Sequence, residues 1–169
     1  VASAVINHNF LKPQNLLNIL KQISVVTIIA CGETMLIVSG MIDLSAGFLC
    51  TTSACVSAGV LASTGHLSLA LLVGIVIGCV CGWINGFLIT YYKLQPFIAT
   101  LSTMTIGRGF AQVYSNGKPY TISDPSFKVI GQGYFLGIPV PIILLVIFCI
   151  IGLVILTMTT FGRYVFAIG

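Results

Sequence analysis

Three charged side chains fall in or beside the most apolar runs of this chain, and they are the residues whose types could do chemistry there. Glu33 and Arg108 each lie inside an apolar run, and Asp43 lies in "SGMIDLSAG", between two such runs. A charge at the centre of a membrane helix costs roughly 2.5 to 3.5 kcal/mol on insertion scales, so such residues usually pair, line a wet cavity or relay protons. Glu33 and Arg108 could form an ion pair, or either could line a wet cavity, and an unpaired Glu33 could carry a proton.

Asp43 falls where one helix has to stop and another has to begin. Gly40 can adopt the left-handed conformation that ends a helix, and Asp43 or Ser45 can cap the N–H groups that start the next one. An unsatisfied break is very unfavourable in lipid, and capped breaks inside transporters often line the substrate path. We therefore predict a helix-break motif or translocation pathway made by Gly40, Asp43, Ser45, Gly47 and Arg108.

No other constellation suggests catalysis. The sequence shows no nucleophile with a base, no paired catalytic carboxylates and no metal-ligand spacing, so we expect neither an enzyme nor a metal site. Every cysteine lies inside an apolar run, without a C-x-x-C or histidine-containing motif, which favours a role as a small core hydrophobe over a redox role. These residues are Cys31, Cys50, Cys55, Cys79, Cys81 and Cys149.

The composition defines the elements that must position these residues. Of 169 residues, 57% are hydrophobic and 6% are charged, with a mean hydropathy of +1.12. Soluble domains carry about 25% charged residues, so this pattern indicates a membrane protein. The net charge of +4 is spread as single residues, which argues against a nucleic-acid partner. We predict one all-α transmembrane domain over residues 1–169.

Apolar stretches of about 20 residues, the length that crosses a bilayer as a helix, divide this polytopic helix bundle into about five spans. They cover residues 20–39, 46–63, 67–91, 96–114 and 140–160, with a long polar loop at 115–139. Asn15 is a plausible N-cap of the first helix. In the third span, glycines recur every fourth residue and predict a packing face against another helix, with Asn85 bonding across it. They are Gly74, Gly78, Gly82 and Gly86.

Several segments in order resemble one family. "VSGMIDLSAG" resembles the G-G-I-D-L-S-x-G signature of permease subunits of bacterial ATP-binding-cassette importers for ribose, xylose, galactosides and related molecules. "LQPFIATLSTMTIGRGFAQVYSNGKPY" and "FGRYVFAIG" are similar to later segments of the same family. Besides the helix-break residues and Arg108, the family positions include Pro96, Phe97, Thr100, Asn116, Gly117 and Arg163. Two positions depart from the pattern, since Met41 replaces a usual glycine and Glu33 replaces a usual methionine.

The resemblance implies an N-terminal half of such a permease, without the family's first span and its C-terminal half. It implies a multi-pass subunit of the bacterial plasma (inner) membrane that imports a small polar solute, a monosaccharide above all. The implied partners are an ATP-binding-cassette ATPase, an extracytoplasmic sugar-binding protein, a second permease subunit and the lipid bilayer. ATP and Mg would be bound by the ATPase, with no cofactor on this chain. The family topology places Lys93 and Arg163 in the cytoplasm and the 115–139 loop outside.

Two other functions stay open at this stage. The first is an ion-coupled secondary transporter that uses Glu33 as proton carrier and Arg108 as its partner. The second is a non-transporting remnant of a permease gene. The residues do not identify the solute, and they do not distinguish a homodimer from a pair of different permeases.

Overall fold

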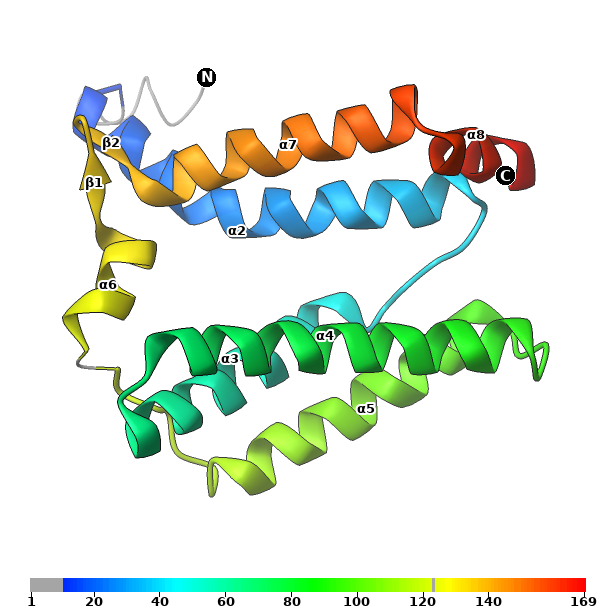
Figure 1. Cartoon of the computed structure of the whole chain (residues 1–169), viewed down its shortest axis with the longest axis horizontal. Helices are drawn as coiled ribbons and strands as arrows, with labels where there is room; N and C mark the ends of the chain where they lie inside the picture. Colours follow the sequence, from blue (N-terminus) through cyan, green and yellow to red (C-terminus); the bar gives the residue numbers. More distant parts are fainter. Residues whose placement is uncertain (1–10, 123) are drawn as a thin grey trace.

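Helices make up nearly all of residues 11–122 and 124–169, the part of the chain that the computed structural model describes. Figure 1 shows their arrangement in two layers, with α2, α7 and α8 in one and α3, α4 and α5 in the other. Residues 39–45 join the layers at one place, and the segment that contains α6 joins them at another. The helices are α2 (Pro13–Val38), α3 (Ala46–Thr64), α4 (Leu67–Thr90), α5 (Pro96–Tyr114), α6 (Pro125–Gln132), α7 (Val140–Met158) and α8 (Thr160–Ile168).

Proline and glycine set several helix boundaries. Pro13 and Pro96 each occupy the first turn of a helix, where the missing N–H has no intrahelical partner to lose. Lys12 is the N-cap residue of α2, so the expectation that Asn15 caps this helix is wrong. At the end of α3, Gly65 has a φ of 70°, the left-handed conformation that glycine adopts without strain.

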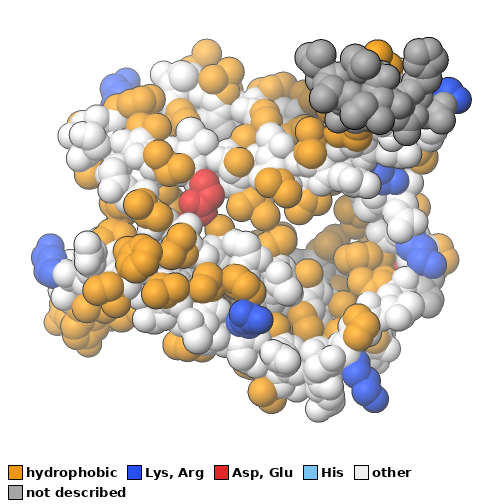
Figure 2. All heavy atoms as spheres, turned by 180° about the vertical axis from the view of Figure 1, so that it is seen from behind, with side chains coloured by type: hydrophobic (Ala, Val, Ile, Leu, Met, Phe, Trp, Pro, Cys, Tyr) orange, Lys and Arg blue, Asp and Glu red, His pale blue; other side chains and the backbone are white. Residues whose placement is uncertain are grey.

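Four helices have the length and apolar composition needed to cross a membrane: α2, α3, α4 and α7. The sequence predicts about five spans, and α5 does form over the expected residues. It is absent from the four because it is more polar, carrying Arg108, Gln112 and several hydroxyl side chains. The all-α membrane class is confirmed. Large apolar side chains such as Val113, Trp83 and Leu153 are exposed, and hydrophobic atoms cover much of the surface in Figure 2, as expected for a lipid-facing bundle.

The polar loop predicted at 115–139 contains structure that the sequence pattern did not reveal. Asp124 caps α6, since its Oδ1 accepts from the N–H of Ser126 at 2.8 Å and from that of Phe127 at 3.3 Å. A two-residue hairpin follows, with β1 (Tyr134–Phe135) antiparallel to β2 (Ile138–Pro139). This short ladder leads directly into α7.

The glycine stripe of α4 packs only at its start. A Cβ on Gly74 would lie 2.5 Å from Ser57 Oγ of α3, whereas a Cβ on Gly78, Gly82 or Gly86 would meet nothing within 4 Å. At 3.6 residues per turn, each step of four residues rotates the stripe by about 40°, so Gly86 points about 120° away from Gly74. Among the described residues, only Gly74 of this stripe therefore packs against another helix, and a packing role for Gly78, Gly82 and Gly86 stays a prediction.

Candidate translocation site

The helix break between α2 and α3 starts with a fully bonded helix end. Gly40 has a φ of 76°, and its N–H donates to the Ile37 carbonyl at 3.0 Å. The N–H of Met41 donates to the Leu36 carbonyl at 2.9 Å. This pair of bonds is the Schellman motif, which satisfies carbonyls that the end of a helix leaves free. Gly40 therefore ends α2 as predicted, although Met41 stands where the family usually has glycine.

Asp43 organises the start of α3. Its Oδ1 accepts from both the N–H and the Oγ–H of Ser45, each at 2.6 Å. Ser45 is the N-cap residue of α3 and is completely buried, but its hydroxyl does not cap the helix. Instead it is held by the carboxylate, because a charged acceptor makes a stronger hydrogen bond than a neutral one. Neither side chain accepts from the free N–H groups in the first turn of α3, so the prediction that Asp43 or Ser45 caps this helix is wrong. The carboxylate and hydroxyl instead bond each other in the link before the helix.

Two neighbouring helices hold the break in place. Asn85 of α4 donates from Nδ2 to Ser45 Oγ at 3.0 Å, and the N–H of Leu44 donates to Thr100 Oγ1 of α5 at 3.2 Å. Asn85 and Thr100 are 5% and 2% exposed. The Oδ1 of Asn85 is buried without a partner among the described residues. The predicted bond of Asn85 across a helix contact exists, and its partner is the helix break. We call Asp43, Ser45, Asn85 and Thr100 the break cluster.

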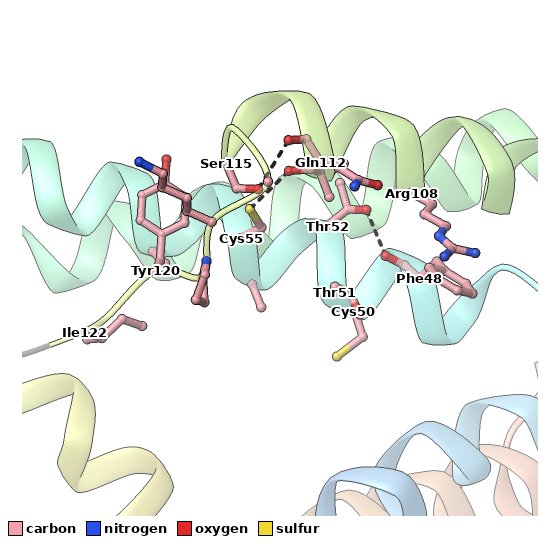
Figure 3. A pocket seen from close by; sticks show the side chains of 16 residues that line it. Phe48, Cys50, Thr51, Thr52, Cys55, Arg108, Gln112, Ser115, Tyr120 and Ile122 are labelled. Carbon is pink, nitrogen blue, oxygen red and sulfur yellow. Dashed lines mark hydrogen bonds between the residues drawn. The ribbon is translucent and has the colours of Figure 1, made fainter.

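A groove of about 680 Å³ runs between α3, α5 and the segment after α5. Figure 3 shows its lining side chains, with Phe48, Thr51 and Thr52 on α3 and Arg108 and Gln112 on α5. The Arg108 guanidinium lies over the Phe48 ring, 5.7 Å from its centroid. Such cation–π contact with an aromatic face stabilises a cation without a carboxylate. We call this feature the α3–α5 groove.

Thr52 fastens the two helices beneath this groove. Its Oγ1 bonds the Phe48 carbonyl of its own helix at 2.8 Å and the Gly107 carbonyl of α5 at 3.0 Å. A Cβ on Gly107 would lie 3.2 Å from that oxygen, so the glycine permits the close approach. The position of Arg108, next in sequence, follows from this contact.

Glu33 and Arg108 do not form the ion pair that the sequence allowed. Glu33 is half-buried on α2, in the layer opposite to that of Arg108. Figure 2 shows acidic side chains gathered between the two layers on the face it displays, with Lys and Arg scattered elsewhere. Arg108 lies in the α3–α5 groove and Asp43 in the break cluster, and the first turn of α3 joins the two.

The remaining predicted residues are spread over the fold. Pro96 starts α5, Phe97 is exposed beside it, and Arg163 is exposed on α8. Asn116 and Gly117 end α5 in a second Schellman motif, with φ values of 52° and 68°. Gly47 is exposed near the start of α3. Thr100 was predicted only as a family position, and its bond to the Leu44 backbone has no signal in the sequence.

The described residues contain no group of three or more His, Cys, Asp or Glu side chains that could hold a metal ion. The groove and the break cluster offer hydrogen-bonding groups, aromatic faces, the Arg108 guanidinium, the Lys118 ammonium and the Asp43 carboxylate. These groups can bind and release a polar molecule by non-covalent contacts.

Spanning helices, a hydrogen-bonded helix break and a polar groove beside it define a multi-pass membrane protein of the permease class. The chain belongs to the family described as branched-chain amino acid transport system / permease component, whose model matches residues 15–169. This finding agrees with the resemblance drawn from the motifs.

Curated relatives give the same result. The ribose import permease protein RbsC of Bacillus subtilis (strain 168) is 46% identical over 168 residues, which cover 98% of this chain and 52% of the relative. RbsC of Escherichia coli (strain K12) is 34% identical over 170 residues, covering 98% and 53%. The L-arabinose transport system permease protein AraH of the same strain is 37% identical over 169 residues, covering 100% and 52%. The chain thus spans about half the length of these relatives. No solved structure matches it.

Proposed function

We propose that this chain is part of the membrane-spanning permease subunit of an ATP-driven, binding-protein-dependent importer in the bacterial plasma (inner) membrane. The observation that carries the proposal is the break cluster, in which Asp43 and Ser45 bond each other in the link between two membrane helices and two other helices hold that link. Interrupted helices in transporters are tolerated where they are buried in protein or line the substrate path. The α3–α5 groove begins one turn further along α3.

The proposed solute is a monosaccharide. The names of the relatives specify ribose import and L-arabinose transport. The α3–α5 groove places Thr51 and Gln112, which can hydrogen-bond hydroxyl groups, beside the apolar faces of Phe48 and Tyr120. Small-molecule sites commonly combine an apolar wall with a few placed polar groups. Arg108 and Lys118 also line the groove and can donate to hydroxyl groups, so this mixture suits a polyol.

The proposed assembly includes three protein partners. An ATP-binding-cassette ATPase binds ATP and Mg and drives transport, so this chain performs no chemistry. An extracytoplasmic sugar-binding protein delivers the solute, with the 115–139 segment on the outer side. A second permease subunit, identical or different, completes the pathway.

The test is solute uptake by the full-length subunit in proteoliposomes with the ATPase and binding protein encoded beside it. Labelled ribose and L-arabinose are offered with ATP on the ATPase side or with a proton gradient alone. We expect uptake of at least one sugar that requires ATP and persists when a protonophore dissipates the gradient.

An alternative function rests on Glu33, which is half-buried in α2 and unpaired with Arg108. Uptake that follows the gradient without ATP and disappears in Glu33→Gln would overturn the importer and support an ion-coupled transporter. An assembled complex that transports neither sugar under either condition would overturn the proposed sugar import and favour a non-transporting remnant.

A further inference from the structure

The contact between α2 and α7 brings together two thiols that lie far apart in the sequence. The Sγ atoms of Cys31 and Cys149 are 3.4 Å apart and share a hydrogen bond, and both side chains are half-buried. None of the six cysteines forms a disulfide in this structure. Two cysteines 118 positions apart give no sequence signal of their proximity, which is why the sequence favoured simple core residues.

The backbone around these thiols is arranged for close approach. Gly152 lies one turn after Cys149 on α7, and a Cβ placed on it would lie 4.0 Å from Cys31 Cβ and 3.7 Å from Met35 Cε. Met35 lies one turn after Cys31 on α2, so the two thiols sit on the faces that α2 and α7 turn toward each other. The absence of a side chain at Gly152 lets the helices meet at the level of the thiols.

We propose that Cys31 and Cys149 are a reversible disulfide site that fastens α2 to α7. A disulfide has an S–S length of about 2.04 Å, so the sulfurs must approach by about 1.4 Å from their 3.4 Å separation. Closing this distance requires rotation about one or both Cα–Cβ bonds. The proposal concerns the fold itself and is independent of the transported solute.

The oxidation removes two electrons and two protons. Each thiol loses its hydrogen, the S–S bond forms, and a two-electron acceptor is reduced. A lipid-soluble quinone, which becomes the quinol by taking up both electrons and both protons, is the class of oxidant able to reach thiols within the bilayer. A dithiol reductant reverses the reaction by thiol–disulfide exchange.

The experiment uses the full-length subunit in membranes, with a protease site inserted after Lys118 in the exposed turn between α5 and α6. Membranes are oxidised with the permeant diazene diamide, the remaining thiols are blocked with a maleimide, and the inserted site is cleaved. On a denaturing gel without reductant, we expect the two fragments to migrate as one band. With dithiothreitol they should separate, and intact mass should show two fewer maleimide additions after oxidation.

Cys31→Ser and Cys149→Ser should each give separate fragments without reductant. Cys50→Ser, which alters an exposed thiol of α3, is the matched control and should keep the fragments joined. Fragments that separate from the oxidised wild type, or that stay joined in Cys31→Ser, would overturn the proposal. So would a band at twice the subunit mass in place of the internal link. The mass measurement on the wild type decides the question even if a serine variant fails to fold.

Discussion

Ser45→Ala tests whether the break cluster is held by the hydrogen bonds described above. The wild-type hydroxyl donates to Asp43 at 2.6 Å and accepts from Asn85 at 3.0 Å, and its residue is fully buried. Its removal loses a charge-assisted bond, worth about 1.5 to 3 kcal/mol, and leaves the buried Asn85 amide without its partner, a penalty of about 1 to 3 kcal/mol. Asp43 keeps the N–H of residue 45, so we expect the free energy of unfolding to fall by an amount in the lower part of the combined range, about 2.5 to 4 kcal/mol.

The assay is unfolding of the full-length subunit in mixed micelles, followed by circular dichroism, as a double-mutant cycle with Asn85→Leu. Asn85→Leu alone removes the unpaired Oδ1 together with the bond, so it should cost less than Ser45→Ala. The coupling energy should be about 0.6 to 1.7 kcal/mol, the range measured for hydrogen bonds between membrane helices. Ser63→Ala, an exposed serine of α3 whose hydroxyl bonds only its own helix, is the control and should change little. Additive effects of Ser45→Ala and Asn85→Leu would refute the bond between these side chains.

Three further substitutions follow from the geometry. Gly162→Ala should abolish folding of the α7–α8 corner, because the added Cβ would clash with the Leu156 carbonyl. Gly47→Ala is the control, since its Cβ would meet nothing within 4 Å, and it should leave the yield of folded protein unchanged. Equal yields of the two variants would contradict the described corner. Gly74→Ala should lower the free energy of unfolding by about 1 kcal/mol because Ser57 must move. Gly82→Ala, on the open side, should raise it by up to about 1 kcal/mol because alanine has the higher helix propensity. Thermal unfolding of both variants decides whether the stripe turns away as described. Gln112→Leu in the α3–α5 groove should reduce ATP-driven uptake at least tenfold, and Thr105→Val on the same helix outside the groove should not; equal uptake by the two variants would remove the groove from the proposed path.

Local features were predictable from the sequence because they depend on neighbouring residues. The positions of the long helices follow from apolar runs, and the end of α2 follows from Gly40. The place of Asp43 at the break also follows from its position between two runs, although its carboxylate bonds Ser45 and does not cap α3. Contacts between residues far apart in the sequence were harder to predict. Glu33 and Arg108 suggested an ion pair by charge alone, yet they occupy different layers.

The glycine stripe shows why periodicity alone misleads. A spacing of four residues marks one face only over a short length, since the helix repeats every 3.6 residues. Gly74 therefore meets α3, while Gly82 and Gly86 turn outward. By contrast, Asn85 points inward beside an outward glycine, and its partner Ser45 is forty positions away. A pattern on one helix predicts which residues share a face and leaves open which element that face meets.

The break cluster and the α3–α5 groove behave as one unit because α5 is bonded to both. Thr100 holds the Leu44 backbone at the break, and Gly107, two turns further along α5, accepts from Thr52 at the base of the groove. A shift of α5 would therefore alter the start of α3 and the position of Arg108 together. The α2–α7 pair has its own close contact at Cys31 and Cys149, and it is joined to this unit by residues 39–45 and by the segment that contains α6. Since Gly40 and Met41 are hydrogen-bonded to the end of α2, and the break is bonded to α4 and α5, relative motion of the two layers would have to break these bonds or change the backbone of both links.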